Sequence, residues 1–341
     1  MEANFNLNLI DILNLTYGDP INSISLTMNK ILFGTMMGKF GIYDINNKSI
    51  QILSEISNEQ ISGTSFSKDL KYFYISIGDE KIVQFDTNNR EQFKTFNGYE
   101  QEEVHIDRCD SCFCLLNENQ FLMLFLIEPQ RNEDPIQSYN CEYTLKIIKD
   151  NNSIEEKNGN INMSNYIVPF DFKNNIFVFL EHCSKEKRQL KIYNFEKDQF
   201  DNCIECVKGV GHISFIKIIN TNRFIVVSNY NMISIRDESF QIINRYVNEG
   251  EIISIDYYYD DNQVLHLLYI DEDYDLIDGY FNENNEFILS LSVNLSLKDD
   301  IDEILRKKGL FNMDFPYYIK GNTKYIVVTC DYACLIFQKT I

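Results

Sequence analysis

A short segment recurs along the whole chain and constrains its fold more than any other feature. In each copy, an alternating apolar stretch closes on an aromatic or polar residue, followed by Asp or a residue in its place. The copies lie at residues 41–44, 83–86, 147–150, 191–194, 234–237, 276–278 and 335–338. Their last residues are 42, 64, 44, 43, 41 and 60 positions apart. Four of these six intervals agree with a repeat of about 40 to 45 residues, the length of a four-stranded sheet repeated along a chain.

The two long intervals each contain an insertion. Residues 128–140 form a polar segment with two prolines, Pro129 and Pro135. The second insertion, at about residues 294–312, carries apolar side chains at helical spacing between Ser296, which can cap a helix, and Gly309, which can end it. This pattern predicts one short helix at residues 296–309.

The composition favours strands over helices. Only two alanines occur, whereas Phe (25) and Tyr (21) are abundant, and such residues prefer strands. A hydrophobic content of 44% is enough for a large core. Together with the repeat, this predicts an all-β protein: a β-propeller of seven four-stranded antiparallel blades.

Several turns resemble those of WD-repeat β-propellers. Residues 67–72 resemble the turn between the first two strands of such a repeat, and the turns at Gly38 and Gly78 resemble the turn before its third strand. Gly211 and His212 resemble the Gly-His pair that opens a repeat. The chain contains no Trp, so other residues fill every Trp-Asp position.

The final repeat lacks one strand. It offers strands near residues 315–319, 324–329 and 333–338, after which the sequence ends. Residues 4–10 alternate polar and apolar side chains, and an unpaired edge is a liability. We therefore expect the N-terminal strand to be the outer strand of the last blade, closing a single domain over residues 1–341.

Two alternatives for the fold stay open at this point. Residues 112–117 and 121–127 can be assigned to strands in more than one way, which leaves six or eight blades possible. Two smaller β domains meeting near the asparagine-rich residues 151–162 are the other alternative. The regular spacing beyond that stretch favours one continuous propeller.

The charge excludes some classes of partner. The chain carries 51 acidic and 31 basic residues, a net charge of −20, which opposes binding to nucleic acid or anionic lipid. The longest apolar run, residues 121–127, is too short to span a bilayer, so membrane insertion is not expected. Residues 1–15 lack the features of a signal peptide, which predicts an intracellular, cytoplasmic protein with nine reduced cysteines.

The cysteines offer a weak metal signal. Cys109 and Cys112 form one CxxC pair, and Cys203 and Cys206 form another, so the four could bind zinc if they met in space. The repeat places the two pairs in different blades, which favours buried cysteines in core strands. We predict no metal and no cofactor.

Acidic residues cluster in the sixth repeat. Asp271, Asp273 and Asp275 resemble the start of a calcium loop, but Leu276 stands where that loop needs Gly. An acidic turn between two strands fits better, and with Asp260 and Asp261 it could attract a basic partner.

No catalytic signature occurs in the sequence. The four histidines are scattered, and the common nucleophile, phosphate and dinucleotide motifs are missing. The leading hypothesis is therefore a non-catalytic scaffold that binds other proteins in a multi-subunit complex, with a cytoskeletal or ciliary location by analogy of fold. A reader of basic peptides using the acidic surface of the sixth blade, and a propeller enzyme with a central-channel site, are the alternatives.

Overall fold

The computed structural model divides the chain into two compact units, which are described separately below. Unit 1 comprises Met1–Phe66 and Asn248–Ile341, and unit 2 comprises Ser67–Val247. The structure describes residues 6–14, 19–55, 59–67, 69–78, 81–89, 91–97, 112–117, 120–127, 139–149, 154–163, 170–173, 176–182, 188–194, 196–197, 199–206, 213–295, 318–330 and 333–340.

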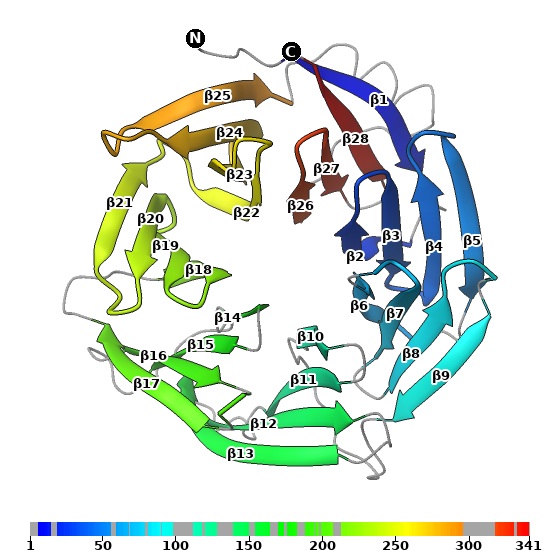
Figure 1. The fold of residues 1–341 in the computed structure, drawn as a ribbon, viewed down its shortest axis with the longest axis horizontal. Coiled ribbons are helices and arrows are strands. Elements are labelled where there is room, and N and C mark those ends of the chain that lie inside the picture. The colour runs from blue at the N-terminus through cyan, green and yellow to red at the C-terminus, as the bar shows by residue number, and fades with distance from the viewer. Residues whose placement is uncertain are drawn as a thin grey trace. The chain divides into compact units, whose positions relative to one another are not determined.

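The described residues form seven four-stranded sheets joined by turns (Figure 1). Six sheets follow chain order: β2 (Ile21–Leu26), β3 (Lys30–Thr35), β4 (Lys39–Asp44), β5 (Ser49–Glu55); β6 (Ile61–Phe66), β7 (Tyr72–Ile77), β8 (Lys81–Asp86), β9 (Gln92–Asn97); β10 (Cys112–Asn117), β11 (Gln120–Ile127), β12 (Tyr139–Lys149), β13 (Ile154–Met163); β14 (Phe170–Lys173), β15 (Ile176–His182), β16 (Arg188–Asn194), β17 (Gln199–Cys206); β18 (Ile213–Asn220), β19 (Arg223–Ser228), β20 (Met232–Asp237), β21 (Ile242–Val247); and β22 (Ile252–Tyr259), β23 (Leu265–Asp271), β24 (Asp275–Phe281), β25 (Phe287–Asn294). The seventh has the order β1 (Asn6–Asn14), β28 (Ala333–Thr340), β27 (Tyr325–Cys330), β26 (Tyr318–Gly321). No helix that could cross a bilayer occurs in this part of the chain.

The middle strands of the sheets are buried on both faces. Residues 31–35 of β3, 224–228 of β19 and 325–330 of β27 are buried without alternation. The outermost strand β21 instead alternates between exposed and half-buried side chains. Continuous burial means that both faces of a sheet are covered, which is what stacked sheets require.

The recurring Asp has a structural role at the end of the third strand. Asp44, Asp86, Asn194 and Asp237 each accept two backbone N–H bonds from the turn that follows. These bonds satisfy backbone donors that the ladder leaves open.

The sixth copy needs a correction. The sequence pattern placed its end at Asp278, but β24 continues to Phe281, and Asn282 caps the turn by accepting the N–H groups of Asn284 and Glu286. Asp278 lies in the middle of the strand.

The prediction for the N-terminal strand is confirmed. β1 pairs antiparallel with β28, from Asn6 opposite Thr340 to Asn14 opposite Ala333, and Figure 1 shows the two strands side by side. One face of this sheet packs on the sheet β22–β25 through Leu7, Leu268 and Phe337. The other face packs on the sheet β2–β5 through Leu13, Phe33 and Ile336. The first and last strands of the chain thus share one sheet and two cores.

Side chains of the innermost strands also join neighbouring sheets. In unit 1, Asp256 of β22 accepts the Gly321 N–H at 3.3 Å and lies 3.4 Å from the Lys320 ammonium. In unit 2, Asp171 of β14 accepts the Ile218 N–H at 2.6 Å and lies 3.8 Å from the Lys217 ammonium. The same device, an Asp that binds a backbone N–H and the preceding Lys, therefore recurs in both units.

The remaining expectations have different outcomes. Residues 112–117 and 120–127 are β10 and β11 of one sheet, and seven sheets are consistent with seven blades. Residues 154–163 form β13, which pairs with β12 as the last strand of that sheet. The predicted helix at residues 296–309 and most of the insertions at about 128–140 and 294–312 lie outside the described residues.

The clasp between β1 and β28 can be tested by truncation of a buried side chain. Ile12 of β1 is buried in the core shared with the sheet β22–β25. Ile12→Ala should therefore lower the free energy of unfolding by about 2–5 kcal/mol. Urea denaturation followed by fluorescence measures the change. The exposed Asn8 on the same strand provides the comparison, because Asn8→Ala removes only one exposed hydrogen bond to Thr340 and should cost about 1 kcal/mol or less.

Candidate functional site: a buried ionic cluster around Asp278

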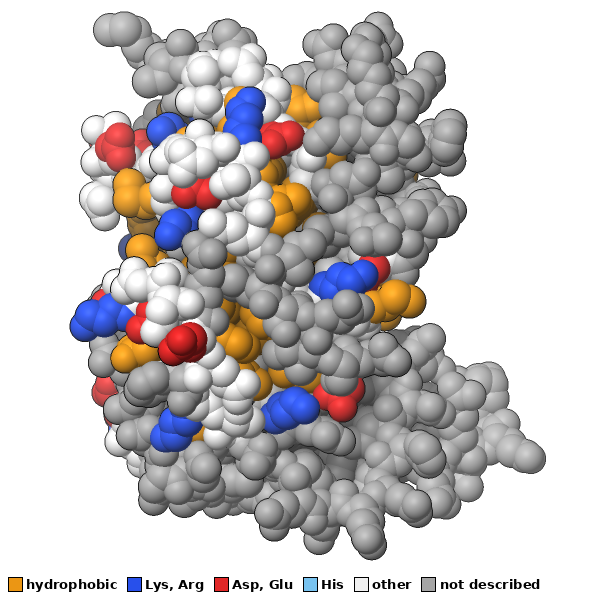
Figure 2. Space-filling model, turned by 90° about the vertical axis from the view of Figure 1, so that its right-hand side faces the viewer, with side chains coloured by type: hydrophobic (Ala, Val, Ile, Leu, Met, Phe, Trp, Pro, Cys, Tyr) orange, Lys and Arg blue, Asp and Glu red, His pale blue; other side chains and the backbone are white. Residues whose placement is uncertain are grey.

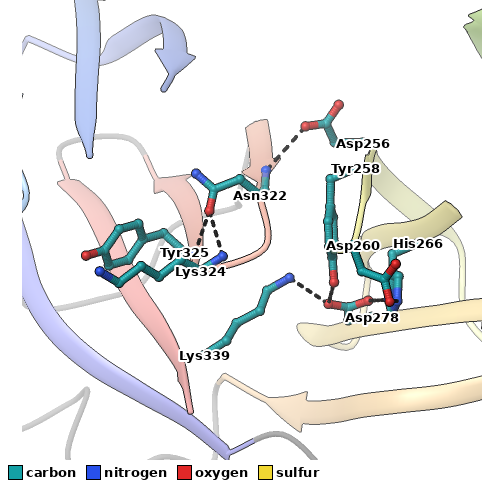
Figure 3. Close-up of polar contacts among 10 residues, drawn as sticks. Asp256, Tyr258, Asp260, His266, Asp278, Asn322, Lys324, Tyr325 and Lys339 are labelled. Carbon is teal, nitrogen blue, oxygen red and sulfur yellow. Dashed lines mark hydrogen bonds and ion pairs between the residues drawn. The ribbon is translucent and has the colours of Figure 1, made fainter. Parts of the chain in front are cut away.

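A group of ionisable side chains in the described part of unit 1 surrounds Asp278. This residue is 1% exposed in the middle of β24. Its Oδ1 lies 2.8 Å from His266 Nδ1, and its Oδ2 accepts the Tyr258 hydroxyl at 2.5 Å and the Lys339 ammonium at 2.9 Å (Figure 3). An ionised carboxylate only accepts hydrogen bonds, so His266 Nδ1 carries the proton.

Four strands bring this cluster together. Tyr258, His266 and Asp278 come from three successive strands of one sheet, β22, β23 and β24. Lys339 reaches them from β28 of the neighbouring sheet β1–β28–β27–β26, which we call the clasp sheet. The Lys339 ammonium lies 3.6 Å from the centre of the Tyr258 ring, which stacks on the His266 ring at 4.9 Å. The cluster therefore holds the clasp sheet to the sheet β22–β25.

The pKa of Asp278 reflects these contacts. Burial opposes its ionisation, but the His266 and Tyr258 hydrogen bonds and the Lys339 ammonium outweigh burial and hold the pKa of Asp278 below its usual value. Burial raises the pKa of Tyr258 far above its ordinary range, and the Asp278 carboxylate adds to this. At neutral pH the cluster is thus an Asp carboxylate that accepts from a neutral Tyr, a Lys and a His.

The arrangement is suited to structure rather than to chemistry. Both oxygens of Asp278 are engaged, and the Lys339 side chain is 3% exposed. On the solvent side, His266 Nε2 lies 3.8 Å from Asp260, and Figure 3 shows Asp260 beside the imidazole. A substrate would have to break these contacts to reach any group in the cluster.

No local sequence pattern predicts this cluster. In the sequence, His266 is one of four scattered histidines, Asp278 resembles the end of a repeat, and Tyr258 and Lys339 belong to no motif. The available signal is the position of Asp278 within an otherwise apolar strand, because a charge there needs a partner.

The five acidic candidates do not form one patch. Asp260 and Asp261 lie in the turn between β22 and β23, whereas Asp271, Asp273 and Asp275 surround the turn between β23 and β24. Successive turns of an antiparallel sheet lie at opposite ends, and a strand of this length separates them by about 20 Å. Only the second group contains three of the candidates together.

Asp271 is not a surface acid. It is buried, its Oδ1 accepts the N–H groups of Asp273 and Asp275, and its Oδ2 accepts from Asn248 at 2.8 Å. Burial outweighs these bonds and raises the pKa of Asp271. Asp261 and Asp273 are exposed, and Asp260 and Asp275 are half-buried.

The structure does not bring the zinc candidates together. Cys112 lies on β10, the first strand of its sheet, and Cys203 and Cys206 lie on β17, the last strand of the next. β10 approaches β14, and three strand spacings of about 4.8 Å separate β14 from β17. Cys109 lies outside the described residues, which contain no group of three or more potential metal ligands.

Charges are mixed on the described part of the surface in Figure 2. Lys and Arg side chains lie among Asp, Glu and apolar side chains there. This mixture is typical of a solvated protein surface.

Two solved structures are similar to the chain over nearly its full length. The WD40 β-propeller domain of Doa1 has a TM-score of 0.62 at 12% identity, covering 97% of this chain and 97% of that chain. A chain from the crystal structure of the mitotic checkpoint complex has a TM-score of 0.65 at 9% identity, covering 98% and 92%. The fold is a WD40 β-propeller. No protein-family model and no curated protein sequence matches the chain.

This propeller replaces the missing Trp residues with other buried side chains. The positions before the terminal Asp or its stand-in hold the buried residues Tyr43, Phe85, Tyr193, Arg236 and Phe337. Arg236 donates to Ser234 Oγ at 3.1 Å and to the Phe240 carbonyl at 2.9 Å, and its guanidinium lies over the Phe240 ring. Several different side chains thus fill one structural position. This explains why comparison of structures identifies the fold, whereas comparison of sequences does not.

The ion pair can be tested by removing one partner. Lys339→Met leaves the Asp278 carboxylate buried without its cation, and should lower the free energy of unfolding by about 3–5 kcal/mol. Lys320→Met is the matched control, because the Lys320–Asp256 pair is more exposed and its loss should cost less than about 1 kcal/mol. Equal losses in the two variants would contradict a structural role for the cluster.

The pH dependence of stability should distinguish the two buried aspartates. Because the folded pKa of Asp278 is lowered, its contribution is present above the ordinary pKa of 3.8 and is lost as the pH falls through the folded value. The pKa of Asp271 is raised, so its contribution is present at low pH and is lost as the pH rises through the folded value. In denaturation between about pH 3 and pH 7, the stability of wild type relative to Asp278→Asn should fall on acidification, and relative to Asp271→Asn it should rise.

Proposed function

We propose that the chain is a non-catalytic scaffold that binds other proteins within a larger intracellular assembly. The observation that carries this proposal is the WD40 propeller fold over nearly the whole chain. A propeller presents many loops and strand edges on a rigid frame, a form suited to holding several proteins. One of the similar chains comes from a structure of a complex, the mitotic checkpoint complex.

The ionic cluster supports a scaffold over an enzyme. Catalytic carboxylates and histidines need access to a substrate, whereas the Asp278 carboxylate is fully engaged by Tyr258, His266 and Lys339. We therefore assign the cluster to the rigidity of the frame.

We also propose that residues 1–341 form one propeller domain that works in the cytoplasm. The β1–β28 clasp supports the first part, because it joins strands from both ends of the chain. Cys334 supports the second, because it is a buried free thiol, as expected in a reducing compartment.

A second candidate function is the recognition of basic peptide segments in unit 1. Exposed Glu251, Glu272 and Asp273 lie at the same end of the sheet β22–β25. The Glu272 carboxylate accepts the Glu251 N–H at 3.1 Å, and the Glu272 N–H binds the Glu251 carbonyl at 2.8 Å, which fixes both backbones. The replacements Glu272→Gln and Asp273→Asn test this function without disturbing the buried Asp271.

The scaffold function predicts stable partners. Purification of the tagged endogenous protein at moderate salt, followed by mass spectrometry and native mass measurement, should yield a fixed set of proteins in stoichiometric amounts. Lys339→Met should reduce recovery of the whole set, because it destabilises the frame, whereas Lys320→Met should leave recovery unchanged. A protein that purifies alone as a monomer would contradict the proposal.

A further inference from the structure

Strand β21 is an outer strand with an apolar surface. Ile242, Ile243 and Val247 are 44%, 38% and 57% exposed. β25, the other outer strand whose side chains are described in full, exposes only Leu289 to this degree, at 50%. A single exposed apolar side chain is ordinary, but three within six residues of one strand form a candidate contact surface.

The same strand has an open edge. β21 comes last in the order β18-β19-β20-β21, and no other described strand pairs with its outer side. Natural proteins usually protect such edges with charges, prolines or bulges. β21 has one charge, Arg245, and no proline, and its register shift lies at the Ile242 end. Residues 244–247 keep a regular register with β20.

Strand β20, which pairs with β21 in the same sheet, is fixed by burial and hydrogen bonds. Residues 233–236 of β20 are buried, Ser234 Oγ donates to the Val226 carbonyl at 3.3 Å, and the Arg236 guanidinium is bound on two sides. An edge that is already ordered loses little conformational entropy when another strand pairs with it. β21 is therefore well prepared to bind an extended segment.

We propose that the open edge of β21 pairs with an extended segment of another protein, with apolar side chains flanked by Lys or Arg. This inference rests on the proposed scaffold function and names its contact. Charge complementarity selects the occupant, because exposed Glu238 lies in the turn that leads into the strand, exposed Glu249 follows the strand by two residues, and the chain carries a net charge of −20. Backbone hydrogen bonds supply affinity in such a pairing, and side-chain contacts supply specificity.

A second copy of the chain fits this edge poorly. Two β21 strands paired antiparallel about Asn244 would bring the end of one strand that follows Glu238 beside the end of the other that precedes Glu249. The net charge of −20 on each copy adds long-range repulsion. Both effects favour a basic partner over self-association.

Hydrogen exchange on the purified assembly tests the contact without any mutation. The amides of residues 242–247 that point away from β20 should exchange at least tenfold more slowly in the assembly than in the free chain. A synthetic peptide with the sequence of residues 241–248 should compete for the partner and restore fast exchange. Unchanged exchange of these amides would overturn the inference while leaving the scaffold function intact.

Matched variants test the same contact by affinity. Val247→Lys should weaken retention of one partner at least tenfold, whereas Leu289→Lys, at a similarly exposed site on β25, should retain it. Circular dichroism and thermal unfolding should show both variants folded. Equal retention by the two variants, or a dimer of this chain that Val247→Lys dissociates, would overturn the inference. Failure to recover any partner would overturn both the inference and the scaffold function.

Discussion

The middle strands of the sheets are apolar on both faces, and this constraint governs the rest of the structure. A sheet with one apolar face can lie on a core and meet water on its other side, but strands such as β3, β19 and β27 must be covered twice. In unit 1 the clasp sheet meets this demand by packing on a sheet at each face. Stacking of sheets is therefore a requirement of the sequence.

Polar contacts between the stacked sheets fix the position of one sheet relative to the next, which apolar contacts alone do not. Apolar faces tolerate sliding, whereas Asp256 binds one backbone N–H of the next sheet, as Asp171 does in unit 2. The Lys339–Asp278 pair sets the position of the clasp sheet in the same way. Burying these charges costs desolvation, and we attribute their presence to the selection of one arrangement of sheets among many similar ones.

The sequence predicted those features that depend on local alternation and spacing. The strands of the last sheet, the role of the N-terminal strand and the four-stranded repeat follow from apolar patterns within short segments. The end of the sixth copy was misplaced because Leu276, Ile277 and Asp278 look like the other segment ends. Only the continuation of β24 to Phe281 shows that Asp278 is internal. The burial of Asp271 depends on Asn248, 23 positions earlier, and the Asp278 cluster depends on Lys339, 61 positions later. Contacts between side chains that distant leave no local pattern to interpret.

The pairing of β1 with β28 makes the order of synthesis a folding problem. Asn8 and Thr340 hydrogen-bond across 332 positions, so a ribosome releases the first strand long before its neighbour exists. During that interval both edges of β1 are unpaired, and its apolar side chains Leu7, Ile12 and Leu13 lack the sheet in which they become buried. Pairing between strands so distant in sequence slows folding, and until it occurs an aggregation-prone strand is exposed to other chains. The clasp that stabilises the finished protein thus also leaves an apolar strand exposed in the nascent chain until synthesis ends.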